Sequence, residues 1–230
     1  MPDEHPHHHR SLQGGGARAA VFGISDGLVS NVALILGMAG AHTSATSVRL
    51  AGLAGLVGGA FSMAAGEYVS MRAQTELMQR ELRVERDALH RQPEGERREL
   101  TAIYERRGLE SDLAAELASE MMRDPETALE THAREELGIN PHQLGNPFQA
   151  AASSFVMFAI GAFLPLVPWL FTSGTAATWA SVIIAGIASL VVGGALSFFT
   201  GKPWLWSACR QLLISGVAAG VTFTIGRIIG

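Results

Sequence analysis

The chain has 230 residues, 48% of them hydrophobic, and a net charge of −4 at pH 7. Its single cysteine, Cys209, excludes an internal disulfide and any cysteine-built metal cluster, and the negative charge argues against nucleic-acid binding. Of the 38 Lys, Arg, Asp and Glu residues, 28 fall within residues 72–146. Since a soluble domain mixes charged and apolar residues, this segregation indicates a membrane protein with one polar insertion.

Five apolar runs are long enough to cross a hydrocarbon core of about 30 Å, which takes roughly 20 helical residues. The first run contains Asp26 and is too long for the apolar core of a signal peptide. We therefore predict an all-α integral membrane protein with five transmembrane helices. The predicted spans are residues 19–41, 50–71, 148–171, 176–199 and 205–226.

The predicted organisation is a polar N-terminal tail (1–18), two spanning helices (19–71), an acidic helical domain (72–146) and three spanning helices (147–230). Residues 74–91 contain no glycine or proline, so we expect the second spanning helix to continue into this domain. Further helices are predicted over 96–107, 111–123 and 126–137, with Ser111 as an N-cap. Glycine pairs at Gly23/Gly27, Gly55/Gly59 and Gly216/Gly220 predict close helix packing.

Basic residues near the spans favour a cytoplasmic N-terminus and a cytoplasmic acidic domain by the positive-inside rule. Arg18 precedes the first span, and Arg72 follows the second with three more arginines. Arg49 and Arg227 lie on the opposite side in this arrangement and count against it. Five spans would then place the C-terminus outside.

Asp26 is the first candidate site residue, because a carboxylate inside a spanning helix is costly unless it faces a cavity, a cation or a partner. At about 1.5 Å per residue, Met63 of the second span lies at a similar depth, and Glu67 follows one turn later. Carboxylate oxygen with thioether sulfur suits a first-row divalent ion better than Mg²⁺ or Ca²⁺. The alternative is that Asp26 bonds to Ser30 and Asn31, and that Met63 only packs.

The acidic domain is the second candidate site, with 17 acidic and 11 basic residues. Glu81/Glu85 and Glu96/Glu99 have the spacing of residues that share a helix face, and His132 adds an imidazole. Facing carboxylates would hold a divalent cation, but a solvated surface of ion pairs is favoured on spacing alone. The domain has no paired Glu-x-x-His motif, which argues against a di-iron oxidase. The N-terminal tract PHHHR is a weak metal signal.

Three segments together resemble the vacuolar iron transporter family, over roughly residues 17–230. They are SDGLVSNVALILGMAGA in the first span, GGAFSMAAGEYVSMRAQTE at the end of the second, and EELGINP at the end of the acidic domain. The family implies a homodimer in the membrane lipid, with an ion pathway at its two-fold axis and a cytoplasmic metal-binding domain. Members export Fe²⁺ or Mn²⁺ from the cytosol in exchange for protons, with no prosthetic group and no enzymatic activity.

The resemblance also implies site residues. Asp26 and Met63 match the family's pathway residues, and Glu85, Glu96, Glu99 and Glu136 match acidic positions of its metal-binding domain. Eukaryotic members have a glutamate where this chain has Gly55, and Glu67 would take over part of its role. They also have a methionine pair where this chain has His132 and Ala133, which leaves the choice between iron and manganese open.

Two functions compete. The favoured one is a proton-coupled exporter of divalent iron or manganese for metal homeostasis, placed in the inner or plasma membrane if the protein is bacterial. The other is a membrane-anchored metal-binding or sensing protein that does not transport. The presence of Asp26 and of the Met63/Glu67 stripe in the spans favours transport.

Overall fold

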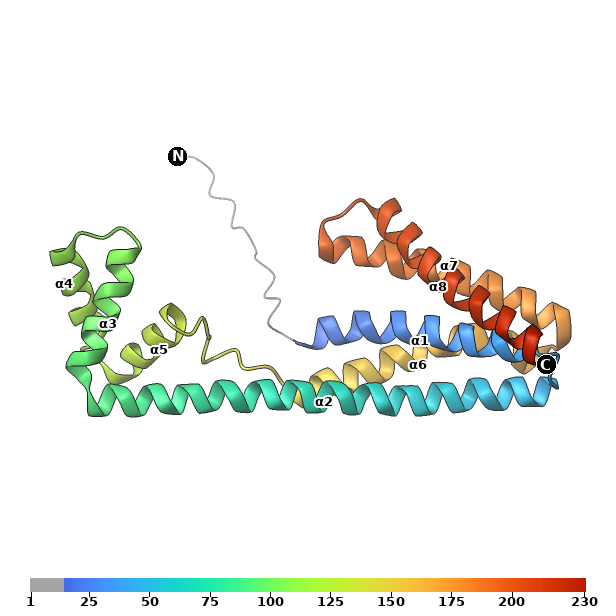
Figure 1. Cartoon of the computed structure of the whole chain (residues 1–230), viewed down its shortest axis with the longest axis horizontal. Helices are drawn as coiled ribbons and strands as arrows, with labels where there is room; N and C mark the ends of the chain where they lie inside the picture. Colours follow the sequence, from blue (N-terminus) through green and yellow to red (C-terminus); the bar gives the residue numbers. More distant parts are fainter. Residues whose placement is uncertain (1–14) are drawn as a thin grey trace. The chain divides into compact units, whose positions relative to one another are not determined.

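The computed structural model describes residues 15–230, and the regular secondary structure of this range is helical throughout (Figure 1). This confirms the predicted all-α class. The helices are α1 (Gly15–Gly40), α2 (Ala45–Arg91), α3 (Pro93–Arg106), α4 (Ser111–Met121), α5 (Pro125–Glu135), α6 (Pro147–Phe171), α7 (Gly174–Thr200) and α8 (Trp204–Ile229).

Five of these helices, α1, α2, α6, α7 and α8, are long and apolar enough to cross a membrane, as predicted. The chain divides into two compact units. Of the described residues, the membrane unit comprises 15–70 together with 146–230, and the polar unit comprises 71–145. Helix α2 runs unbroken through residue 70, so it contributes to both units, as the absence of glycine and proline beyond the second span predicts.

Within the membrane unit, α1 packs most closely against α6 and also contacts α7 and α8. The approach to α6 depends on glycine: a Cβ atom at Gly27 would overlap the carbonyl oxygen of Phe158, and one at Gly161 would overlap that of Ile24. Small residues let spanning helices approach in this way. On the side of α1 that faces α7, Leu28 and Val32 are buried and form a cluster with Ala185 and Ala188.

We expect Gly27→Ala to destabilise the protein by about 1–3 kcal/mol, the usual cost of overpacking, because the new methyl group meets backbone atoms of α6 that cannot rotate away. The measurement is thermal unfolding in detergent. Gly216→Ala on α8 is the control: nothing lies within 4 Å of its new methyl group, so only the higher helix propensity of alanine should act. Equal melting temperatures for the two variants would contradict the packing argument.

Helix α2 packs against both α6 and α1: Val48 packs near Trp169, Ala60 packs near Phe158, and Gly52 meets Ile35 of α1. Its outward side is apolar and exposed, with 50% of the surface of Val57 and 64% of that of Phe61 accessible. In a spanning segment such a face is covered by lipid or by another subunit.

In the polar unit, α3 and α4 form a small hairpin whose core contains Leu100, Tyr104, Ala114 and Ala118. The predicted N-cap of α4 is wrong by one residue. Glu110 is the N-cap, and the Ser111 hydroxyl instead donates a hydrogen bond of 2.6 Å to the Glu105 carboxylate of α3. This bond fixes the hairpin turn, and an alternative partner of this kind is not visible in the local sequence pattern.

Candidate metal sites

The polar unit brings four predicted ligands together, from three different helices. Glu85 lies near the end of α2, Glu96 in the first turn of α3, His132 in α5, and Glu136 at the C-cap of α5. The break at Gln92 and Pro93 turns the chain between Glu85 and Glu96, and the Asp124 side chain starts α5 by accepting a hydrogen bond from the Thr127 amide. His132 and Glu136 are one turn apart, so they share a helix face.

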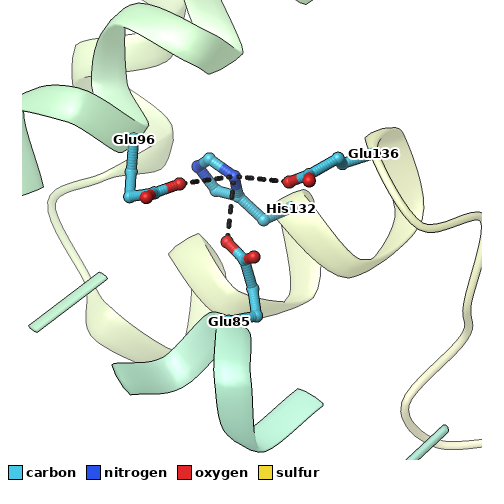
Figure 2. A group of neighbouring side chains, drawn as sticks. All are labelled: Glu85, Glu96, His132 and Glu136. Carbon is cyan, nitrogen blue, oxygen red and sulfur yellow. Dashed lines mark ion pairs between the residues drawn. The ribbon is translucent and has the colours of Figure 1, made fainter. Parts of the chain in front are cut away.

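The three carboxylates converge on one nitrogen of the His132 ring (Figure 2). One ligand atom from each of the four residues lies within 4.8 Å of all the others. His132 is completely buried, and 6% of the surface of Glu85 is exposed. The distances from His132 Nδ1 are 3.2 Å to Glu85 Oε1, 3.9 Å to Glu96 Oε2 and 3.7 Å to Glu136 Oε2.

Several buried polar atoms of this cluster have no hydrogen-bond partner among the described residues. They are Glu85 Oε1 and both ring nitrogens of His132. Buried polar atoms are normally satisfied, and a divalent cation would satisfy Glu85 Oε1 and His132 Nδ1 while offsetting the repulsion among three carboxylates. Carboxylate oxygens with one imidazole nitrogen suit Fe²⁺, Mn²⁺ or Zn²⁺. Glu85, Glu96, His132 and Glu136 are named the acidic cluster below.

The electrostatics of the acidic cluster also favour a bound cation. Burial, with repulsion from Glu136, Glu96 and Glu99, raises the pKa of Glu85 from 4.5 to about 7. Burial also raises the pKa of Glu96, against the lowering effect of His132. Carboxylates gathered where they resist ionisation are a feature of functional sites, and a cation would stabilise their charged form.

Without metal, the polar unit should therefore lose stability as pH rises from 4.5 to 7. In this window the unfolded chain releases the Glu85 proton while the folded chain retains it, so rising pH favours unfolding. A shift of this size corresponds to roughly 3 kcal/mol. The measurement is hydrogen exchange of α3 and α5 in chelator, corrected for intrinsic rates. Glu85→Gln should remove most of the dependence, and a pH-independent wild type would contradict the assignment.

Two other predicted ligands of the polar unit lie outside the acidic cluster. Glu81 is half-buried one turn before Glu85, and its carboxylate lies 3.4 Å from the Arg80 guanidinium. Glu99 is exposed one turn after Glu96, and it acts on the cluster through its charge. Spacing alone did not separate these two glutamates from the clustered ones.

In the membrane unit, Asp26 and Met63 line one pocket of about 300 Å³. Ser30 and Asn31 do not bond to the Asp26 carboxylate as the alternative reading required. The Ser30 hydroxyl donates to the backbone oxygen of Asp26 at 2.6 Å, and the Asn31 amide donates to the backbone oxygen of Ala162. The lining residues are Asp26, Ser30, Asn31, Leu34, Gly55, Gly59, Ser62, Met63 and Phe158.

Glu67 lies outside this pocket. Its carboxylate is 3.1 Å from the guanidinium of Arg18 on α1, and 13% of its side chain is exposed. In the sequence Arg18 is only an orientation signal, because an ion pair between residues 49 positions apart leaves no local signature there. The histidine tract at residues 5–9 lies outside the described residues.

Comparison with known proteins identifies the family. A profile of the VIT family matches residues 17–227. The chain belongs to this family. The relatives include a vacuolar iron transporter of Acanthamoeba castellanii, 36% identical over 95% of this chain and 81% of that protein. Another is vacuolar iron transporter 1 of Arabidopsis thaliana, 30% identical over 92% of this chain and 85% of that protein.

Membership of the VIT family confirms the resemblance inferred from the three sequence segments. Together with the five apolar helices, it establishes the chain as an integral membrane protein. It also confirms the prediction that the chain is not an enzyme, since this is a family of transporters.

Proposed function

We propose that this VIT family protein is a proton-coupled transporter that exports divalent iron, manganese or both from the cytosol. The observation that carries the proposal is the pocket of the membrane unit, which combines the carboxylate of Asp26 with the thioether of Met63. The names of the relatives, vacuolar iron transporters, support iron as a cargo.

The chemistry of the pocket suits coupled transport. Asp26 is exposed on α1, and no described residue forms a hydrogen bond or ion pair with its carboxylate. An ionised carboxylate attracts a divalent cation, and a proton that binds the same oxygen removes that attraction. Cation and proton therefore compete for Asp26, which is the requirement for exchange. The thioether of Met63 favours first-row transition ions over the more abundant Mg²⁺.

We further propose that the acidic cluster collects the ion on the cytoplasmic side. The positive-inside distribution around Arg18 and Arg72 supports a cytoplasmic N-terminus and polar unit. Three carboxylates and one imidazole would concentrate a scarce divalent ion near the membrane. The membrane would be the inner or plasma membrane if the protein is bacterial.

A homodimer is part of the same proposal. Asp26 is exposed on the surface of a single subunit, and an exposed carboxylate within a bilayer is costly. The open apolar side of α2, including Val57 and Phe61, offers a surface for a second subunit. A copy placed there would enclose the pocket and shield Asp26 from lipid.

The test is uptake of Fe²⁺, under anaerobic conditions, and of Mn²⁺ into proteoliposomes with an acidic lumen. We expect accumulation that collapses when an ionophore removes the pH gradient. Uptake independent of the gradient would exclude proton coupling while retaining transport. A complete lack of uptake, with metal still bound by the protein in detergent, would favour the membrane-anchored metal sensor, which the acidic cluster alone could support.

A further inference from the structure

Asn31 is a buried polar residue of α1 that lines the Asp26 pocket, with 2% of its surface exposed. Its amide nitrogen Nδ2 donates a hydrogen bond of 2.6 Å to the backbone oxygen of Ala162 on α6. A carbonyl oxygen can only accept, so this bond fixes which end of the amide is nitrogen and which is oxygen. The orientation of Oδ1 is therefore determined.

Oδ1 of Asn31 has no hydrogen-bond partner among the described residues. A buried amide oxygen without a partner costs free energy, so an unpaired one beside a pocket needs an explanation. Nδ2 holds the side chain in place through α6, which keeps Oδ1 from turning to find another donor. The result is an oriented acceptor on the wall that also carries Asp26.

The residue opposite Oδ1 is Gly55 of α2, which lines the same pocket. A Cβ atom at position 55 would lie 2.7 Å from Oδ1, closer than real side chains approach such an atom. Oδ1 can therefore keep this position only because position 55 has no side chain. Gly58, one turn further along α2, has nothing within 4 Å of such a Cβ, so it has room for a side chain where position 55 has none.

We propose that Asn31 Oδ1 is a neutral oxygen ligand for the divalent cation in the pocket of Asp26 and Met63, and that the absence of a side chain at Gly55 lets Oδ1 hold the position from which it reaches the ion. This inference rests on the proposed function of the pocket. An amide oxygen is a normal ligand for divalent cations such as Ca²⁺ and Mn²⁺, and it adds a hard donor beside the soft thioether of Met63. Asn31 thus becomes a determinant of ion preference.

Gly55→Ala tests the proposal without altering Asn31, and Gly58→Ala on the same helix is the matched control. The added methyl at position 55 obstructs Oδ1 and also meets the flexible end of Leu34, which can rotate away. Loss of one ligand should raise the KM for Mn²⁺ uptake about tenfold, equivalent to about 1.4 kcal/mol, with little change in maximal rate. Gly58→Ala should retain the wild-type KM.

Asn31→Ala supplies a second readout, which a purely structural role would not move. Removing a hard oxygen while leaving the thioether should reduce uptake of Mn²⁺ more than uptake of the softer ion Cd²⁺. We expect the ratio of the two KM values to shift about fivefold or more. A structural defect would affect both ions equally. Because both KM values are measured on the same preparation, their ratio does not depend on the fraction of protein that is folded. It therefore tests the role of Asn31 even in a variant that folds poorly.

The outcomes separate this inference from the proposed function. If wild type transports metal and Asp26→Asn does not, while both Gly55→Ala and Asn31→Ala keep the wild-type KM and ion ratio, Asn31 is only an interhelical hydrogen-bond donor and the inference is overturned. If wild type fails to transport, or Asp26→Asn transports normally, the proposed function of the pocket fails first.

Discussion

Asp26→Asn should reduce proton-coupled metal uptake at least a hundredfold and leave a folded protein. The substitution keeps the size of the side chain but removes its negative charge and its capacity to exchange a proton for a cation. Electrostatic attraction is strong where water is scarce, so loss of the only acidic side chain among the described residues that line the pocket should cost several kcal/mol of cation binding. Each 1.4 kcal/mol is a tenfold change in affinity. Initial uptake rates in proteoliposomes with an acidic lumen measure the effect.

The matched control is Asp112→Asn, the same substitution at an exposed position in the first turn of α4. It should transport like wild type. Elution volume in detergent and melting temperature show whether the Asp26 variant is folded, and we expect both to be unchanged because its carboxylate has no described hydrogen-bond or ion-pair partner. A folded variant that transports at the wild-type rate would remove Asp26 from the ion pathway.

The five spanning helices were predictable because hydropathy over about 20 residues is a strong local signal. The continuation of α2 to Arg91 was equally predictable from the absence of glycine and proline. Helix ends were less so. The N-cap of α4 is Glu110 because Ser111 bonds to Glu105, a contact between two helices that a local pattern does not record.

The sequence predicted which types of residue form the candidate sites, but not which of the individual glutamates lie in the acidic cluster. Glu81 and Glu85 are four residues apart and Glu96 and Glu99 three, spacings that both place a pair on one helix face, yet only one residue of each pair joins the acidic cluster. The choice depends on how α3 and α5 fold against the end of α2, where buried His132 selects the carboxylates near its ring. Tertiary packing decides this.

Helix packing also determines which hydrogen-bond partners the polar residues of the spans have. Ser30 and Asn31 were both expected near Asp26, but each donates its hydrogen bond to a backbone oxygen. For Asn31 that oxygen is 131 positions away on α6, so the unpaired Oδ1 could not be found from sequence. Only the close approach of α1 to α6 makes the bond possible.

Glu85→Gln should weaken metal binding by the acidic cluster between tenfold and a hundredfold. Glu85 is the least exposed of the three carboxylates in the cluster and lies nearest to His132 Nδ1. The neutral amide keeps its volume but removes a charged ligand, and bonds to charged groups are worth about twice as much as neutral ones. The measurement is Mn²⁺ titration of the full chain in detergent at pH 7.5, above the raised pKa of Glu85. An Asp26→Asn background removes the membrane pocket from the titration.

Glu99→Gln is the control that distinguishes loss of a ligand from loss of net charge. It is the same substitution, one turn from Glu96, but its side chain is exposed and outside the cluster. Through charge alone, a group separated from the ion by water should alter affinity by less than about threefold at physiological ionic strength. Equal losses for Glu85→Gln and Glu99→Gln would mean that net charge, not the geometry around His132, binds the ion.

Glu85→Gln, in a chain with intact Asp26, also distinguishes two possible roles of the acidic cluster. If the cluster concentrates ions for the pocket, Glu85→Gln should lower uptake at Mn²⁺ concentrations well below KM and leave the maximal rate unchanged, because saturating metal fills the pocket without help. If the cluster gates the pathway, the maximal rate itself should fall. The number of charges favours concentration: three carboxylates can hold an ion in exchange with solvent, whereas the pocket carries a single one. We therefore expect the loss to disappear at saturating metal.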